Sequence, residues 1–587
     1  MPAAPPPIVS ATAPTPDPRV GLKAGYWDAA EVAWNLRRVS TTPPHEKNVG
    51  IWHSDLAFSG NYVVQGNFNG FQIFDMSNPA KPVIVSTYFC PASQNDVSVY
   101  KNLLFMSSES NTSRTDCGFQ GVPEPVSKDR VRGVRLFDIS DVAKPKLIKS
   151  VETCRGSHTH TVVEQPGDTD NVYIYVSGSS GVRPAEELPG CSDGTMEANP
   201  DTARFRIEVI KVPLAAPQNA AIVTSPRIFT GLTAAPGRGA GPGAAGAQPP
   251  AAVAGGAAGA AGAAGAATPP AGRAGGPGRS GPNQCHDITV YPAAGLAGGA
   301  CNGLGLLLDI REATHPIRID FAADPNMSLW HSATFSNDGT KILFSDEWGG
   351  GTGARCRDTD NKEFGANAIF TIEKNKMVFK SYYKLPAPQT AQENCVAHNG
   401  SMIPIPGREV MVQAWYQGGI SVFDWTDPAK PFEIAYHDRG PLDANRLVTG
   451  GSWSVYWYNG YMISSEIVRG LDIFELLPSG LITQNELDAA KTVKYTHLNA
   501  QGQPKMVWPP SFSLARAFVD QLERSKGLSA SRLSDVRAAL TSAERASGAN
   551  RRTALTALAS SLNADAAGSS DAAKVRELIG AVGALAK

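Results

Sequence analysis

Six of the ten histidines in this 587-residue chain stand where predicted strands begin. His286, His331 and His398 share one position, at the start of three apolar runs of strand type. The full set is His53, His158, His160, His286, His331 and His398. Imidazoles that meet at one place are ligands for Zn, Cu, Fe, Ni or Mn. The sequence therefore predicts a divalent transition-metal site wherever these strand starts converge.

A structural role is the alternative for the same histidines. An imidazole at the start of a strand can hydrogen-bond the backbone of a neighbouring repeat and lock the two together. No H-E-x-x-H string is present to mark a zinc-protease site. Metal binding, direct binding of another ligand and a purely structural role all remain open at this point.

Other polar and aromatic side chains are predicted to lie beside these histidines. Glu347 and Glu466 follow strands that should end at the same place, as metal ligands, as hydrogen-bond partners of ligating histidines or as a general base. Four further residues are predicted to bind a small molecule or a glycan: Trp330, Trp415, Trp453 and Arg469. The G-x-S-x-G and phosphate-loop motifs are absent, which excludes those two chemistries.

A repeated phrase predicts the elements that position these residues. Each copy has an apolar strand-like run, an Asp, a short polar turn and a Pro, in residues 73–82, 136–145, 307–316 and 422–431. An Asp side chain accepts hydrogen bonds from backbone N–H groups just beyond it, and Pro suits an outer strand because it has no N–H. Each phrase is therefore predicted to form a hairpin, with the Asp building its turn.

A second strand pair precedes each hairpin and often turns at Asn-Gly or Asp-Gly. Four antiparallel strands per unit, repeated radially, are typical of an all-β propeller. Seven blades are predicted, beginning near Asn48, Pro91, Cys154, Asn283, Pro325, Glu393 and Val448. Because the innermost strands of a propeller all begin at one mouth of the central channel, this fold would bring the histidines together.

The phrase in residues 73–82 and 422–431 resembles the LVIVD repeat of secreted bacterial and archaeal propellers. The resemblance covers about residues 34–480 and implies the propeller fold, while it says little about activity. Blades 3 and 5 lack the Asp of the motif, at residues 209–213 and 369–372, so they are assigned by position.

Eight cysteines are present, without a C-x-x-C pair. Their places relative to the strands predict four sequential disulfides: Cys90–Cys117, Cys154–Cys191, Cys285–Cys301 and Cys356–Cys395. Disulfides require an oxidising compartment, so a secreted, periplasmic or cell-surface location is expected. The N-terminus has neither a charged region nor an apolar core, so a signal peptide would already have been removed. Eight thiols in a cytosolic protein are the alternative.

Composition excludes two classes of partner. The net charge is −1 with 18% charged residues and no basic stripe, which argues against nucleic acid. No run of about 20 apolar residues is present, so no membrane span is expected.

The chain divides into segments of different character. Residues 1–33 are an N-terminal extension, and residues 34–480 form the propeller, in which 34–47 supply a strand that closes blade 7. Residues 234–282, rich in Ala, Gly and Pro, are predicted to be a disordered insertion. A linker, 481–510, leads to four amphipathic helices in 511–587. This small helical domain should bury its own apolar core, or serve a surface or self-assembly partner.

Three functions follow from these features. The first is binding of a metal, a small molecule or a glycan at a histidine-rich channel mouth. The second is a metal-dependent lyase, hydrolase or oxidase that uses the same histidines. The third is a cell-surface adhesion or assembly module with an inert channel.

Overall fold

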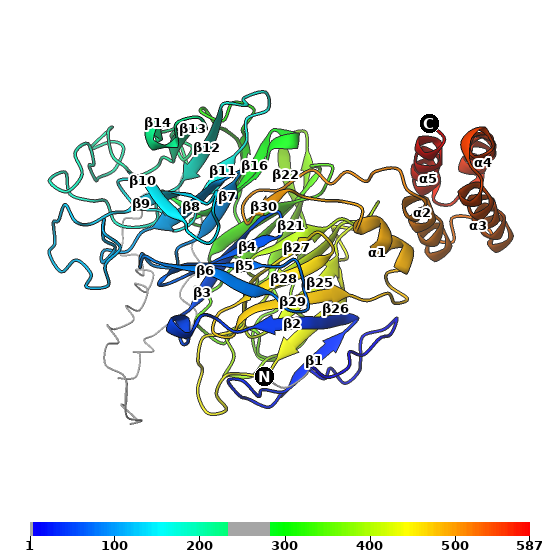
Figure 1. Ribbon diagram of the computed structural model, residues 1–587, viewed down its shortest axis with the longest axis horizontal. Helices are drawn as coiled ribbons and strands as arrows, with labels where there is room; N and C mark the ends of the chain where they lie inside the picture. The colour runs from blue at the N-terminus through cyan, green and yellow to red at the C-terminus, as the bar shows by residue number, and fades with distance from the viewer. Residues whose placement is uncertain (1–3, 233–281) are drawn as a thin grey trace.

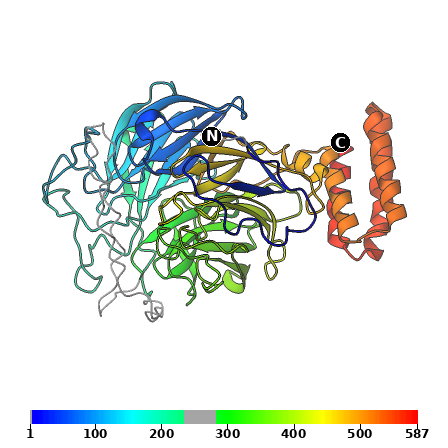
Figure 2. The same ribbon diagram turned by 90° about the horizontal axis from the view of Figure 1, so that it is seen from below.

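The computed structural model describes residues 4–232 and 282–587. These residues form seven antiparallel sheets around one axis, with helices at the C-terminal end (Figures 1 and 2). The predicted seven-bladed β-propeller with a C-terminal helical domain is confirmed. The predicted insertion at 234–282 lies outside the described residues except for Pro282.

The blades are numbered along the chain, and their strands are given from the axis outward. Blade 1 contains β3 (His53–Ser59), β4 (Tyr62–Asn67), β5 (Gly70–Asp75) and β6 (Val83–Phe89), and blade 2 contains β7 (Val97–Tyr100), β8 (Leu103–Ser108), β9 (Gly133–Asp138) and β10 (Lys146–Glu152). Blade 3 contains β11 (Thr161–Val163), β12 (Asn171–Val176), β13 (Glu208–Pro213) and β14 (Ala221–Thr224), and blade 4 contains β15 (Cys285–Tyr291), β16 (Leu296–Cys301), β17 (Leu304–Asp309) and β18 (Ile317–Ala322). Blade 5 contains β19 (Trp330–Phe335), β20 (Lys341–Asp346), β21 (Asn367–Glu373) and β22 (Lys376–Tyr383), and blade 6 contains β23 (Gly400–Ile403), β24 (Val410–Ala414), β25 (Ile420–Asp424) and β26 (Phe432–Arg439). Blade 7 contains β27 (Ser452–Tyr458), β28 (Tyr461–Glu466), β29 (Gly470–Leu476) and, from the N-terminal region, β2 (Leu36–Thr42). Short 3₁₀ turns occupy Glu46–Asn48, Pro217–Asn219 and Pro292–Ala294.

The N-terminal region closes the ring with two strands where the sequence predicts one from residue 34. Strand β2 pairs antiparallel with β29, whereas β1 (Glu31–Trp34) adds a fifth strand to blade 6 by pairing with β26. Asn35 joins them with a φ of 53°, and its side chain donates to the Ile434 carbonyl at 3.0 Å. Asn adopts this left-handed conformation more readily than most residues, so one residue suffices to carry the chain between blades.

The turn-building role predicted for the Asp of each repeated phrase is confirmed. One carboxylate oxygen of each Asp accepts a hydrogen bond from the backbone N–H two residues further on, at 2.7 to 3.0 Å. The four residues are Asp75, Asp138, Asp309 and Asp424.

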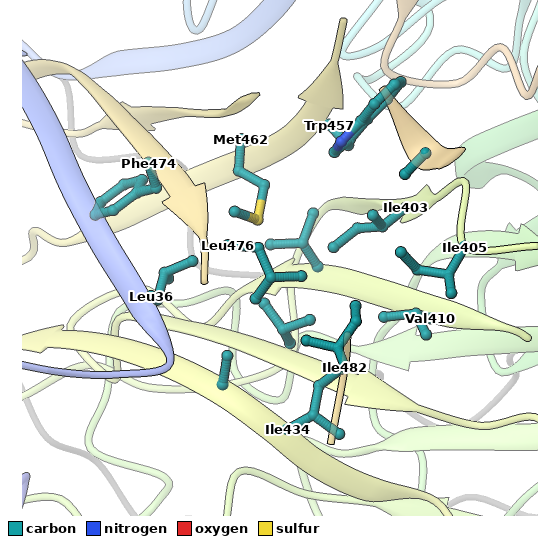
Figure 3. Close-up of a cluster of buried hydrophobic side chains, with 14 of the residues drawn as sticks. Leu36, Ile403, Ile405, Val410, Ile434, Trp457, Met462, Phe474, Leu476 and Ile482 are labelled. Atoms are coloured by element: carbon teal, nitrogen blue, oxygen red, sulfur yellow. The ribbon is translucent and has the colours of Figure 1, made fainter. Parts of the chain in front are cut away.

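Apolar side chains of neighbouring blades pack together and hold the ring. Figure 3 shows the cluster between blades 6 and 7, to which Leu36 of β2, Ile434 and Phe474 belong, all three fully buried. Burying a side chain of this size stabilises the fold by about 1.5–3 kcal/mol. Packing therefore supports the closing strand in addition to its hydrogen bonds.

All eight cysteines lie among the described residues and form four disulfides in the predicted order: Cys90–Cys117, Cys154–Cys191, Cys285–Cys301 and Cys356–Cys395. The bonds close loops of 16 to 39 residues within the chain. Cross-links of this kind restrict the unfolded chain and are typical of proteins in an oxidising compartment.

The segment after blade 7 crosses the end of the channel opposite the histidines, and we call residues 495–508 the plug. Its strand β30 (His497–Asn499) pairs with the innermost strand β3. The Asn499 side chain bonds both the N–H and the C=O of Val99, at 2.7 and 2.9 Å. Gln503 does the same to Phe335, at 2.8 Å for both bonds. Part of the expected linker is thus ordered, and a cavity of only about 40 Å³ remains beside it.

Five helices lie after blade 7 among the described residues, α1 (Gln484–Ala490) before the plug and α2 (Phe512–Arg524), α3 (Ala530–Arg545), α4 (Gly548–Gly568) and α5 (Ala572–Leu585) after it. The last four, which lie together at one end of the molecule (Figure 1), are the predicted amphipathic helices, and their apolar side chains pack on one another. Glu486 of α1 accepts hydrogen bonds from Arg408 of blade 6 at 3.0 Å and from Arg524 of α2 at 2.6 Å, so it fastens the bundle to the propeller. None of the described helices is long and apolar enough to cross a membrane.

We expect Asn499→Ala to lower the free energy of unfolding by about 2 kcal/mol. The substitution leaves the buried N–H and C=O of Val99 without their partners, and each unsatisfied buried group costs about 1–3 kcal/mol. Chemical denaturation measures the change. His497→Ala is the matched control, because it removes a partly exposed pair with Glu164, and such pairs contribute about 0–1 kcal/mol. Equal effects of the two substitutions would contradict the role assigned to Asn499.

Candidate metal centre at the channel mouth

Four imidazole rings form a row across the mouth where the innermost strands begin. His158 precedes β11, His286 and His331 lie at the starts of β15 and β19, and His398 precedes β23. The centres of successive rings are 4.6, 4.0 and 4.1 Å apart. The structure thus brings together four of the six histidines that the sequence proposes as ligands, and we call them the histidine row.

Glu347 lies between two members of the row. Its carboxylate oxygens are 3.8 Å from the Nε2 atoms of His331 and of His398. One ligand-capable atom from each of the three residues lies within 4.8 Å of the other two, and all three side chains are buried. Two ligands about 2.1 Å from a tetrahedral ion are about 3.4 Å apart. The observed separations therefore exceed hydrogen-bond length and approach the spacing of ligands around one ion.

The tautomer of His398 leaves its Nε2 free to coordinate. The Nδ1 atom donates to the backbone carbonyl of Trp453, so Nε2, which faces Glu347, carries the lone pair. A hydrogen bond from the second ring nitrogen to a carbonyl is the usual way in which proteins orient a ligating histidine. Burial lowers the pKa of His398 to about 3, so the ring is neutral at pH 7.

His331 has no hydrogen bond at either ring nitrogen among the described residues. Its Nδ1 is buried without a partner, and its Nε2 has only the distant Glu347 oxygen. Burial first, and then repulsion from His286 and His398, lowers the pKa of His331 well below its usual value. The residue is 1% exposed and its Nδ1 atom is fully buried, so water does not satisfy Nδ1. A neutral imidazole without partners is in the state that binds a metal.

A second triad of potential ligands shares His331. It contains His286, Asp287 and His331, again with ligand-capable atoms within 4.8 Å of one another. The Nδ1 of His286 is 2.9 Å from the carboxylate of Asp287. The row therefore offers two overlapping sets of three ligands, with His331 common to both.

The blade 3 end of the row carries an ion pair. The Nδ1 of His158 is 2.5 Å from Glu109, whose second oxygen accepts from Ser179 at 2.7 Å. Burial alone would lower the pKa of His158, but the charge and the hydrogen bond of Glu109 outweigh burial and raise it to about 8. The same pairing, against the effect of burial, lowers the pKa of Glu109 to about 2. His158 is therefore largely protonated at pH 7, unlike His331 and His398.

Tyr416 holds Glu347 in place. Its hydroxyl donates to the carboxylate at 2.5 Å, and its ring lies 4.6 Å from that of His398. The residue has a φ of 54°, which is unusual for a bulky side chain, and two backbone hydrogen bonds with Ser452 fix it. Burial raises the pKa of Glu347.

Two histidines proposed from the sequence lie outside the histidine row, and these two and His158 lie outside both triads of the described residues. The Nδ1 of His53 is 3.0 Å from the Ile467 carbonyl, which joins blade 1 to blade 7. The Nδ1 of His160 is 2.8 Å from the Ser107 hydroxyl. Both contacts match the structural role that the sequence leaves open.

The other predicted site residues divide in the same way. Glu466 accepts from the N–H of Val468 and from Nη1 of Arg469, each at 2.9 Å, and Arg469 also donates to backbone carbonyls of the N-terminal segment. Trp330 and Trp415 are 1% and 0% exposed, in the core between blades. The ring of Trp453 lies 5.2 Å from that of His398, at the row itself.

Two features of the site were not expected from the sequence: the place of Asp287 in a triad and the hydrogen bond from Tyr416 to Glu347. The sequence did contain a signal for Asp287. It occupies the same position in blade 4 as Asp55 in blade 1 and Asp96 in blade 2. Tyr416 comes from a loop after β24 and carries no motif. Its role appears only once blades 5 and 6 are placed side by side.

Behind the row, two carboxylates are buried near one another. Asp55 accepts from the Tyr456 hydroxyl and from the Asn399 amide, each at 2.7 Å. Burial raises its pKa, and burial followed by repulsion from Asp55 and Asp287 raises that of Asp96 well above the usual value.

We expect metal-free Asp55→Asn protein to gain stability relative to wild type as the pH rises from about 4 to 7. A buried carboxyl with a raised folded-state pKa stays protonated when its unfolded counterpart ionises, so its contribution is present at low pH and is lost as the pH rises through the folded-state pKa. The relative gain should be at least about 1 kcal/mol. Denaturation at several pH values measures it.

Asp75→Asn is the control with the opposite sign. Hydrogen bonds from Ser77 lower the pKa of Asp75, so that variant should lose stability relative to wild type as the pH rises. A flat difference between Asp55→Asn and wild type would show that Asp55 ionises normally in the folded protein.

The chain has one family match and several similar solved structures. Residues 53–89, which form blade 1, match the family model of the LVIVD repeat. No curated protein matches the chain. Similar solved structures include a proposed 6-phosphogluconolactonase from Bacteroides uniformis (10% identity, TM-score 0.40, covering 70% of this chain and 89% of that one). They also include the designed protein Ika8 (8%, 0.35, 75% and 99%) and Sqt1 from Saccharomyces cerevisiae (8%, 0.36, 70% and 81%). Residues 53–89 of this seven-bladed β-propeller therefore carry an LVIVD repeat.

Proposed function

We propose that this protein binds a divalent transition metal through His331, His398 and Glu347, and through the metal a small molecule or glycan at the channel mouth. His286 lies next to His331 and can complete the coordination. Zn, Cu, Fe, Ni and Mn all accept imidazole together with carboxylate ligands.

The observation that carries this proposal is the state of His331. A buried polar group without a hydrogen bond costs about 1–3 kcal/mol, and such groups are rare in folded proteins. The described residues leave both nitrogens of this buried ring without a hydrogen bond. An ion between His331, His398 and Glu347 would satisfy one nitrogen and relieve the cost of burying the carboxylate.

Access from one side favours a ligand that reaches the metal at the mouth. The side chains of His286 and His158 are 17% and 26% exposed, whereas His331 and His398 are buried. The plug covers the opposite end of the channel. The partly buried Trp453 at the row offers an aromatic face on which a sugar or another planar group can stack.

The four disulfides support an extracytoplasmic location for this activity, in the secreted fraction, the periplasm or the cell surface. Divalent metals in such compartments would meet a site whose histidines are already neutral. No preceding deprotonation of His331 or His398 would be required at pH 7.

Metal analysis of the purified protein tests the proposal. The wild type, loaded with Zn²⁺ or Co²⁺ and desalted, should retain about one equivalent, and His331→Ala should lose at least tenfold in affinity because both ligand sets share this residue. His315→Ala is the control, since His315 is exposed and pairs with Glu312. Absence of bound metal in the wild type after loading with each first-row divalent ion would refute the proposal.

A metal-dependent lyase, hydrolase or oxidase is the second candidate. The buried Glu347, with its raised pKa and its hydrogen bond from Tyr416, has the environment of a general base. Glu466 would be the base only if its bonds to Arg469 and the backbone opened. In a substrate screen, turnover should require the metal and disappear in Glu347→Gln. Turnover that survives this substitution would remove Glu347 from the mechanism.

A further inference from the structure

The face of the propeller that carries the histidine row also holds a buried arginine, Arg132, whose side chain has no hydrogen-bond or ion-pair partner among the described residues. Arg132 immediately precedes β9, and the register Ser108↔Gly133 places it opposite Glu109 at the end of β8. It is 5% exposed, and among the described residues its guanidinium makes no hydrogen bond or ion pair. The Nε atom is fully buried, so the edge formed by the two terminal nitrogens is the one that a ligand can reach.

The neighbouring arginines show that this situation is exceptional on the face. Arg183 and Arg130 both pair with Glu187, Arg183 at 2.6 Å. Arg183 also reaches Glu152 at 2.6 Å. Arg155 donates to the backbone carbonyls of Ser180 and Asn283, at 3.1 and 2.9 Å. Glu187 and Glu152 thus form their direct ion pairs with Arg130 and Arg183, and neither pairs directly with Arg132.

Glu109 forms no ion pair with Arg132 either. Its carboxylate oxygens pair with His158 and accept a hydrogen bond from Ser179. Burial, and then repulsion from Arg183, lowers the pKa of Arg132 to about 10, against the weaker attraction of Glu187 and Glu109. The guanidinium is therefore still charged at pH 7, and a buried charge that makes no direct ion pair is costly.

We propose that Arg132 is the anchor of an oxyanion subsite, which takes the carboxylate, sulfate or phosphate group of a small molecule at the blade 2 end of the mouth. A guanidinium edge with two free terminal nitrogens matches two oxygens of such a group. The subsite lies beside the Glu109–His158 pair, so the rest of the molecule can extend along the histidine row. It needs no metal, so it goes beyond the metal site and can fail separately from it.

The experiment uses the full chain after treatment with a chelator, which keeps the result independent of the metal proposal. Sodium acetate, sulfate and phosphate are titrated at constant ionic strength against sodium chloride, with calorimetry and the melting temperature as readouts. We expect saturable binding and a raised melting temperature for at least one of the three anions. Preference for acetate identifies a carboxylate ligand, and preference for sulfate or phosphate identifies a tetrahedral one.

Substitutions then assign the binding to this residue. Arg132→Gln should weaken anion binding at least tenfold. Arg132→Lys keeps the charge but loses the two-pronged guanidinium edge, so its anion affinity should lie between those of the wild type and Arg132→Gln. Arg204→Gln is the matched control, because Arg204 is a partly exposed residue paired with Asp193. The melting temperature of Arg132→Gln without anion checks that the variant folds. It should be no lower than that of the wild type, because the substitution removes a buried charge that makes no direct ion pair. Equal affinity of Arg132→Gln and wild type, or no saturable binding of any of the three anions by the wild type, would overturn the proposal.

Discussion

The pairing of β2 with β29 is the constraint on which the histidine row depends. The innermost strands of seven sheets begin at one mouth only when the sheets form a closed ring, and β2 supplies the missing outer strand of the last blade. Asn35 makes this possible by turning the chain from blade 6 to blade 7 within one residue. The packing of Leu36 against Ile434 and Phe474 adds apolar burial to the same joint. Sequence positions as distant as His158 and His398 thus come to lie in one line.

Burial decides what the row can do. His331 and His398 are excluded from water, which keeps their rings neutral, and the hydrogen bond to Trp453 sets which nitrogen of His398 faces Glu347. At the other end, the partly exposed His158 meets Glu109 and is protonated. The neutral imidazoles of His331 and His398 are therefore suited to a cation. The other end of the row is positively charged, because the protonated His158 lies there near Arg132. A molecule that carries an anionic group and a metal-binding group would fit both ends.

Much of the fold follows from the sequence because its signals are periodic. The repeated Asp and Pro mark the hairpins, and the hairpins set the blade register that aligns His286, His331 and His398. The plug could not be predicted in this way. Its contacts come from Asn499 and Gln503, whose side-chain amides bond the backbone of β7 and β19 as a strand would, and such contacts have no period.

The candidate site was predicted less completely for a similar reason. His158 and His160 are two residues apart, and only the three-dimensional arrangement shows that the first joins the row while the second contacts Ser107. Trp330 and Trp415 have the residue type of a binding surface, yet both side chains face the core. Arg132 has no sequence signal at all, because its significance is the lack of an acceptor after its neighbours have paired. Residue type and blade register predict which residues lie near the channel mouth. The hydrogen bonds and ion pairs that each side chain makes decide its role there.

Anomalous diffraction from crystals of the zinc-loaded protein tests the central claim most directly. The account predicts a peak between His331, His398 and Glu347, about 2.1 Å from the Nε2 of His398. A peak bound elsewhere, or an empty row in crystals whose solution contains saturating zinc, would contradict it.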